Sequence, residues 1–337
     1  MNPCPIQEEG NEGAVDWEQK VLLVGGRDDV LEELPYIESL LQASGEFCWT
    51  SWKRNLVTPR SSVQAVGPAG EDGVALVVGG FGGGLHLNTC ELLPTEDLGD
   101  AEPVVSKTEK GMKMNFKRSG PACARLGSAA YVFGGFDGKQ PIKFVEVLKA
   151  GPSGWSDCEA GWKEVHMMAD ARYQACAVAH DGQVYVFGGF DGEKVLSTAG
   201  AFIPDGDEAC SGGVGKWRKL PDMPRPRMSA SAVVLQNKIV LVGGTTASGS
   251  LLPAIDMLDL ESGQWLEAGS IPPLQPARQD SAVFVHEDKI WVAGGSNKQG
   301  WMNSCVVFDP QSGSWSEGPD LPTSLACCCP LPLQKGS

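Results

Sequence analysis

The chain has 337 residues, a length that an all-β propeller or barrel can reach as a single domain. Its net charge of −15 argues against nucleic acid and acidic membrane surfaces as partners, because clustered Lys and Arg usually recognise both. Forty-three Gly and 23 Pro in a composition that is 42% hydrophobic predict many short strands joined by tight turns, not a disordered tract.

The N-terminal segment 1–19 has neither a basic n-region nor an apolar run, and no 18 consecutive apolar residues occur anywhere in the sequence. Eleven cysteines without a CxxC pair indicate reduced thiols instead of a disulfide framework. We therefore expect a flexible segment at 1–19 in a cytoplasmic protein, with the nucleus as the alternative compartment.

Six apolar runs that end in Gly-Gly form the main pattern of the chain. Their first glycines lie 51–55 residues apart, at Gly25, Gly79, Gly134, Gly188, Gly243 and Gly294. Each run is rich in β-branched or aromatic residues, and turn signals such as Asp137-Gly138 follow. Four short strands in about 50 residues make one blade of a β-propeller.

An arginine and a tryptophan recur in the same register. The arginine lies 16 residues before the first glycine in four repeats and 19 before it in a fifth, at Arg60, Arg118, Arg172, Arg227 and Arg278. The tryptophan occurs once per repeat except in the second, at Trp49, Trp162, Trp217, Trp265 and Trp315. Because each blade must bury an apolar face against its neighbour, we interpret the tryptophans as inter-blade packing residues.

Three places in the chain need separate treatment. In the first repeat, Pro35 and the register favour a strand from about Tyr36, although a helical turn at 29–33 would fit the apolar spacing. In the second, the stretch from Pro94 to Met114 predicts a long loop with a degraded outer strand. After Trp315, the segment LACCCPLPL is expected to supply the missing strand of the first blade, which removes an exposed sheet edge.

The predicted fold is therefore all-β: a six-bladed β-propeller over residues 20–333, with a tail at 334–337. Each blade is expected to have four antiparallel strands, and the C-terminal strand closes the ring by completing the first blade.

These columns resemble the kelch repeat, and the likeness is greatest between Ala130 and Leu260, where YVFGGFDG and VYVFGGFDG occur. The propellers most similar to this pattern are the substrate receptors of BTB-kelch ubiquitin-ligase adaptors. That resemblance implies a monomeric protein-interaction domain that binds a protein or peptide and needs no cofactor. The 337 residues contain no segment like a BTB or BACK module, so the resemblance concerns the propeller alone.

In such kelch receptors, the start of the arginine-led strand and the loop after the double glycine lie on one binding face. The resemblance therefore implies that this face carries the partner site. The candidate residues are Arg27, Arg60, Arg118, Arg172, Arg227, Arg278, Phe81, Phe136, Phe190, Thr245, Ser296, Tyr36 and Tyr173. A ring of guanidinium groups with phenylalanines nearby would suit an acidic peptide with apolar anchors.

Other roles stay open at this stage. The arginines could make structural salt bridges and the phenylalanines could pack between blades. The glycine pairs fit no phosphate-binding motif. Kelch propellers also include actin-binding and scaffolding proteins, and related propellers include sugar-isomerising enzymes and oxidases. The four histidines form no metal-ligand spacing, so neither a catalytic nor a metal site is predicted.

Overall fold

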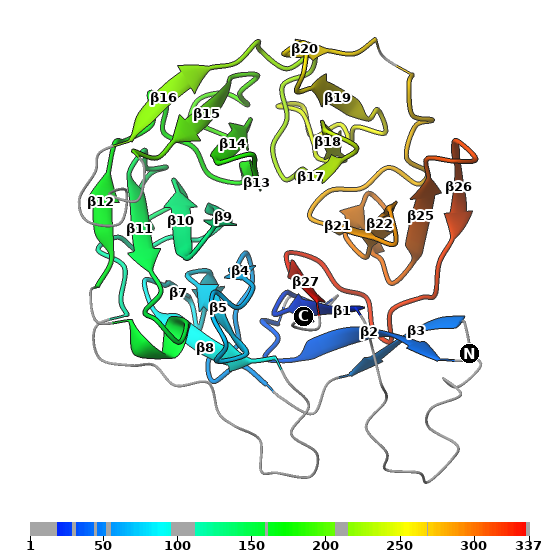
Figure 1. Ribbon diagram of the computed structural model, residues 1–337. Coiled ribbons are helices and arrows are strands. Elements are labelled where there is room, and N and C mark those ends of the chain that lie inside the picture. The colour runs from blue at the N-terminus through cyan, green and yellow to red at the C-terminus, as the bar shows by residue number, and fades with distance from the viewer. Residues whose placement is uncertain are drawn as a thin grey trace, which may run out of the picture.

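The computed structural model describes residues 19–28, 32–43, 46–51, 55–95, 112–158, 161–205, 215–267 and 269–334. Six sheets are arranged around a central axis, and the chain passes through them in sequence order (Figure 1). The predicted six-bladed propeller is confirmed. Residues 1–18 and 335–337 of the predicted terminal segments lie outside the described residues, whereas Gln19 and Gln334 belong to strands.

Blade 1 combines both ends of the described chain. Its strands are β1 (Gln19–Val24), β2 (Ile37–Ala43), β3 (Glu46–Ser51) and β27 (Cys329–Gln334). The order is β27-β1-β2-β3, and β27 pairs antiparallel with β1 from Gln19↔Gln334 to Val24↔Cys329. The C-terminal strand therefore completes the first blade, as predicted, and β2 begins one residue after Tyr36.

Blade 2 has three strands among the described residues, in the order β4-β5-β8. These strands and the hairpin beside them are β4 (Gln64–Val66), β5 (Val74–Val78), β6 (Phe81–Gly82), β7 (Leu85–His86) and β8 (Cys90–Pro94). Residues 96–111 of the predicted long loop lie outside the described residues.

Blades 3 to 5 each have four antiparallel strands. Blade 3 contains β9 (Ala122–Leu126), β10 (Ala129–Phe133), β11 (Val145–Lys149) and β12 (Lys163–Val165), with the 3-10 helix η2 (Trp155–Asp157) before β12. Blade 4 contains β13 (Cys176–His180), β14 (Gln183–Phe187), β15 (Ala199–Ile203) and β16 (Lys216–Lys219). Blade 5 contains β17 (Ser231–Leu235), β18 (Lys238–Val242), β19 (Asp256–Asp259) and β20 (Gln264–Trp265).

Blade 6 has the order β21-β22-β25-β26, with a short hairpin of β23 and β24 beside it. Its strands are β21 (Ala282–His286), β22 (Lys289–Ala293), β23 (Ser296–Asn297), β24 (Gly300–Trp301), β25 (Cys305–Asp309) and β26 (Ser314–Glu317).

The hydrophobic core lies between neighbouring blades, and the repeating tryptophans pack there as predicted. Trp217 packs on Phe133 of the preceding blade with 5.8 Å between ring centroids, and its Nε1–H donates to the His166 carbonyl at 3.0 Å. Trp265 repeats this arrangement one blade further on, with Phe187 at 6.0 Å and the Pro221 carbonyl at 3.0 Å. Each tryptophan thus fastens the outer strand of its blade to the blade before it.

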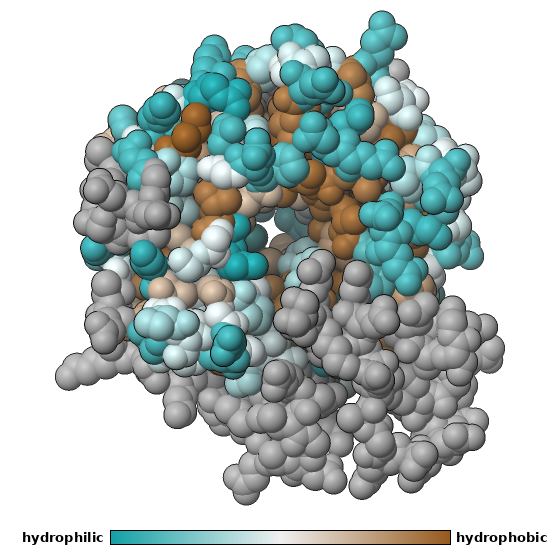
Figure 2. Space-filling view, in the orientation of Figure 1, coloured by the Kyte–Doolittle hydropathy of each residue, from teal (hydrophilic) through white to brown (hydrophobic). Residues whose placement is uncertain are grey.

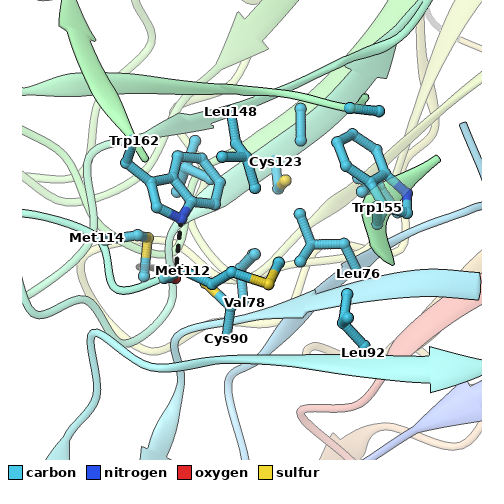
Figure 3. Packing of buried hydrophobic residues seen from close by; sticks show 14 of the residues in the cluster. Leu76, Val78, Cys90, Leu92, Met112, Met114, Cys123, Leu148, Trp155 and Trp162 are labelled. Atoms are coloured by element: carbon cyan, nitrogen blue, oxygen red, sulfur yellow. Dashed lines mark hydrogen bonds between the residues drawn. The ribbon is translucent and has the colours of Figure 1, made fainter. Parts of the chain in front are cut away.

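The interface between blades 2 and 3 contains two tryptophans, both from blade 3. Trp155 and Trp162 approach the cluster around Leu76, Cys90 and Leu148 from opposite ends (Figure 3). The Trp155 Nε1–H donates to the Gly67 carbonyl at 2.9 Å, and Trp162 donates to the Met112 carbonyl at 3.1 Å. Trp155 is fully buried, so η2 adds a second tryptophan to the interface between blades 2 and 3.

Eight of the described cysteines carry free thiols. Cys48 is disulfide-bonded, so the prediction that all the cysteines are thiols is wrong at this position. Across the described part of the chain, no helix is long and apolar enough to span a membrane.

Candidate functional site

The five arginines of the repeat do not form an exposed ring. Arg60, Arg118, Arg172, Arg227 and Arg278 are between 0% and 6% exposed. A guanidinium group at this depth cannot contact a partner while the blades keep their present packing. The expectation that these residues present a cationic binding ring is therefore wrong, and the alternative of a structural role describes them.

Each of these arginines binds the Gly-Gly turn of its own blade. Nη1 of Arg118 donates to the Gly134 carbonyl at 2.6 Å, and Nη1 of Arg172 donates to the Gly188 carbonyl at 2.8 Å. Arg60, Arg227 and Arg278 make the same bond to their own first glycine. Glycine is required there because an added Cβ at Gly134 would lie 2.2 Å from the Arg172 carbonyl oxygen of the next blade.

The same arginines also join neighbouring blades through their backbone. The N–H of Gly80 in blade 2 donates to the Arg118 carbonyl of blade 3 at 2.8 Å, and the Gly135 N–H donates to the Arg172 carbonyl at 2.8 Å. In three blades a buried carboxylate completes the arrangement: Arg60 pairs with Glu91, Arg118 with Glu146 at 2.6 Å, and Arg227 with Asp256. Buried charges of this kind are tolerated because they are paired and hydrogen-bonded.

A row of half-buried rings from blades 2, 3 and 4 lies near the Gly-Gly turns of these blades. We call Phe81, His86, Phe136, Tyr173 and Phe190 the aromatic arc. Consecutive ring centroids lie 5.1, 5.2, 5.5 and 5.8 Å apart, and every pair is tilted or edge-on. The predicted residues Phe81, Phe136, Phe190 and Tyr173 are thus brought together.

Backbone bridges hold the arc in place. Phe81 pairs with Ser61, Phe136 with Ser119, and Phe190 with Tyr173, so each loop after a double glycine is tied to the segment that follows the arginine of the same blade. Because the rings sit on backbone that is hydrogen-bonded on both sides, the surface is largely formed before any partner arrives.

Arg27 extends the arc toward blade 1. Its guanidinium lies 5.5 Å from the centroid of Phe81 and forms an ion pair with Glu33 at 2.7 Å. The side chain of Arg27 is 29% exposed, in contrast to the five arginines of the repeat. It is the one predicted arginine that can reach a partner without rearrangement.

His86 is the member of the arc that the sequence did not point to as a binding residue. Its Nδ1 lies 2.8 Å from Ser119 Oγ, and its ring bridges Phe81 and Phe136. Burial lowers the pKa of His86, which favours the neutral imidazole at neutral pH. The only sequence signal is local: the FGGGLHL loop of blade 2 has a short hairpin that places His86 opposite Phe81.

Three predicted residues lie apart from the arc. Tyr36 is 54% exposed, and no ring contact joins it to the arc among the described residues. Ser296 is half-buried and pairs with Gln279 through its backbone, whereas Thr245 is only 3% exposed. Blades 5 and 6 therefore have Thr245 and Ser296 where blades 2 to 4 have phenylalanine.

The arc has the character of a surface for apolar anchors. Half-buried aromatic rings offer apolar faces together with polar tips, here the Tyr173 hydroxyl and the free nitrogen of His86, and such residues are enriched where proteins bind one another. Within the described ranges, no group of three His, Cys, Asp or Glu side chains is placed to hold a metal ion.

Comparison with known proteins gives matches to kelch-repeat proteins. The Kelch motif model matches residues 171–224, and the KLHDC2/KLHL20/DRC7 Kelch-repeats domain model matches residues 213–327. Beta-scruin of Limulus polyphemus is 29% identical over 59% of this chain and 22% of its own length. Kelch-like protein 23 of Homo sapiens is 23% identical over 73% of this chain and 41% of its own length, so the chain spans less than half of these relatives.

A solved structure titled "Structure of YjhT" superposes with a TM-score of 0.63 at 15% sequence identity. The superposition covers 81% of this chain and 88% of that chain. At this identity the likeness concerns the fold alone.

Proposed function

Because the chain is a kelch-repeat β-propeller similar to those of BTB-kelch proteins, we propose that it binds a segment of a partner protein across the aromatic arc. The observation that supports this proposal is the unbroken row of ring contacts from Phe81 in blade 2 to Phe190 in blade 4. Apolar side chains of the partner would rest on these rings, and the Tyr173 hydroxyl, His86 and Arg27 would give the contact its polar rim.

The chemistry of the partner follows from what is accessible. An acidic peptide was expected because of the arginine ring, and burial of that ring removes the reason for it. Arg27 alone remains, and Glu33 already pairs with it. We therefore propose a partner segment chosen mainly by apolar or aromatic anchors, with at most one acidic group directed at Arg27.

The double substitution F136A/Y173A tests this proposal by removing two adjacent rings from the middle of the arc. We expect the affinity for a captured partner to fall at least about tenfold, because central aromatic residues carry much of the energy of protein interfaces. Capture from a lysate with quantitative mass spectrometry, followed by titration of the recovered partner, measures the effect.

The matched control is H180A, at the end of β13 that points away from the arginine-led end of the strand. It should keep every partner of the wild-type protein. Thermal unfolding of both variants establishes that they are folded at the temperature of the capture. If F136A/Y173A retains all wild-type partners, the arc is not the binding site.

The resemblance to BTB-kelch proteins extends the proposal to recruitment of the partner to a ubiquitin ligase. Co-purification of a cullin with the protein expressed in cells tests this extension separately. Loss of the partner in F136A/Y173A without any cullin would support the arc and contradict the recruitment role.

A further inference from the structure

A closed ring of six backbone hydrogen bonds surrounds the axis of the propeller. We call Ser62, Gly120, Gln174, Ser229, Asp280 and Cys327 the axial ring. In each blade this residue lies two positions after the repeat arginine, or after Leu325 in blade 1. All six have φ between 49° and 57°. Each N–H donates to the carbonyl of its neighbour at 2.8–3.1 Å, and the Ser62 N–H closes the circle on the Cys327 carbonyl.

The side chains of the axial ring line a small polar cavity of about 80 Å³. Each ring carbonyl accepts one hydrogen bond from its neighbour, and the side chains add further polar atoms to the cavity. Ser62, Ser229 and Gln174 supply neutral oxygen atoms, and Asp280 is the only charged residue among those that line the cavity. The face drawn in Figure 2 is hollowed at the centre, where the six blades meet.

Beyond the ring, the axis continues as a channel of about 340 Å³. Alanine, valine, cysteine and proline side chains of the inner strands make up most of its wall, and no residue that lines it carries a charge. The two cavities share Gln64, Ala175, Ala230, Ser231 and Cys328, so they are continuous. Asp280 is therefore the one charged residue among those that line the two connected cavities.

The negative charge of Asp280 is not neutralised within the described part of the chain. No salt bridge includes it there, and its side chain is hydrogen-bonded to Ser229. Arg27 lies close enough to act on Cys327, but its guanidinium is held by Glu33 and Phe81. Burial raises the pKa of Asp280 to about 6, so the carboxylate is ionised near pH 7, whereas burial keeps Cys327 as a neutral thiol.

We propose that the axial ring binds a primary ammonium group carried on a short alkyl stem, such as a lysine side chain or a small alkylamine. An ammonium group has three donors and no acceptor, which matches one carboxylate surrounded by neutral oxygen atoms. Its alkyl stem can pack against the alanine, valine and proline side chains of the uncharged channel. This site does not depend on the aromatic arc, and its ligand can be tested without any protein partner.

The test is a calorimetric titration of the protein with n-butylammonium chloride near pH 7, at constant ionic strength. The neutral analogue n-butanol is titrated in parallel. Wild-type protein should bind the ammonium compound saturably and should not bind the alcohol. Asp280→Asn should weaken ammonium binding at least about tenfold, because it removes a charge-assisted hydrogen bond.

Asp288→Asn is the matched control, since it makes the same change in an exposed turn of the same blade, at the opposite end of β21. It should bind butylammonium as the wild-type protein does, and thermal unfolding should show both variants folded. Equal binding to wild type and Asp280→Asn, equal binding of butanol, no saturable binding to wild type, or displacement by an equal concentration of KCl would overturn the proposal.

Nα-acetyl-lysine amide separates the two sources of the ammonium group. Tighter binding than butylammonium would support the site and assign it to a lysine of a protein partner. Equal or weaker binding, still dependent on Asp280, would support the site and assign it to a small amine.

Discussion

The buried pair of Arg118 and Glu146 both holds the Gly-Gly turn of blade 3 and balances its own charge. The guanidinium donates to the carbonyls of Gly134 and Phe144, at 2.6 and 2.9 Å, while its charge is balanced by the carboxylate. Since both side chains are 0% exposed, neither can be solvated if its partner is removed. Removing one partner of such a pair is far more costly than replacing both.

Arg118→Gln should therefore destabilise the fold by about 3–5 kcal/mol, because it leaves Glu146 charged and buried without its partner. Urea unfolding followed by tryptophan fluorescence measures the change. Arg125→Gln, in the same blade but exposed, is the matched control and should change the free energy of unfolding by less than about 0.5 kcal/mol. If Arg118→Gln changes the free energy of unfolding only slightly, the arginine is not needed for stability and partner binding becomes its more plausible role.

Glu38 occupies the carboxylate position of this pair in blade 1, where the arginine is missing. It faces Leu23 in the register, as Glu91 faces Val77 and Glu146 faces Val132, but the arginine position of blade 1 is Leu325. Glu38 is 5% exposed, Ser51 donates to its Oε1 at 3.1 Å, and its Oε2 has no hydrogen-bond partner. Burial raises the pKa of Glu38.

A raised carboxyl pKa means that the folded protein holds a proton that the unfolded chain releases. Stability from this residue is thus full below the unfolded pKa and is lost as pH rises through the folded pKa. Glu38→Met should stabilise the protein at pH 7 by about 1–3 kcal/mol, since it removes a buried, half-satisfied charge. It should also make the free energy of unfolding depend less on pH in the range where Glu38 titrates.

Chemical unfolding at a series of pH values measures both effects of Glu38→Met. Glu193→Met, at an exposed position, serves as the control and should leave the pH dependence unchanged. A loss of stability at pH 7 in Glu38→Met would show that the carboxylate has an ion-pair role.

At the scale of elements, η2 adds a buried tryptophan to the interface between blades 2 and 3. Trp155 from blade 3 packs in the same cluster as Leu76 and Ala150, beside the repeat tryptophan Trp162. The cluster between blades 1 and 2, where a blade 2 tryptophan would pack, contains no tryptophan among the described residues. Asp72 of blade 2 fixes the helix by accepting the Ser156 N–H at 2.9 Å. The η2 segment of blade 3 therefore supports blade 2 through both apolar packing and hydrogen bonds.

Trp155→Ala should destabilise the protein by about 3–5 kcal/mol, because it opens a large cavity between two blades. Trp301→Ala, which removes a partly exposed tryptophan from the β23–β24 hairpin, is the control and should cost much less. Thermal unfolding of both variants measures the difference. Similar losses in the two variants would mean that η2 does not support blade 2.

At the scale of the whole molecule, the spacing of the double glycines predicts the number of blades because each double glycine is required by the local structure of one blade. Every blade requires a buried apolar strand and a turn too crowded for a side chain, and both leave a mark in the sequence. The same period places the arginines at equivalent positions but does not fix whether they point outward or inward. Only the register shows that Arg118 meets Glu146.

The aromatic arc was predictable in part for the same reason. Phe81, Phe136 and Phe190 share one repeat position, so symmetry predicts their common face. His86 does not belong to a repeat column, and its place between Phe81 and Phe136 results from the β6–β7 hairpin, whose register recurs only in blade 6 among the described strands. Asp280 is a similar case. Nothing in the sequence distinguishes it from other aspartates, and only the structure shows that it lies on the axis of the propeller.

Closure of the ring gives the last prediction. β27 pairs with β1 over six residues, and its segment buries Leu325, Leu331 and Leu333 to between 2% and 5% exposure. Burial of each leucine contributes about 1.5–3 kcal/mol, and together they approach the 5–15 kcal/mol that stabilises a typical domain. A chain truncated after Ser324 should therefore lose cooperative thermal unfolding, because blade 1 would expose the edge of β1.

A circular permutant distinguishes loss of the strand from loss of a chain end. Gln19 and Gln334 are direct partners in the antiparallel pair, so an Asn-Gly turn can join them as a hairpin, with new termini opened at the exposed turn between Asp181 and Gly182. The permutant should unfold cooperatively at or above the wild-type temperature, since the closing pair becomes local in sequence. A truncated chain that unfolds like the wild-type protein would mean that the other strands hold the ring closed without β27.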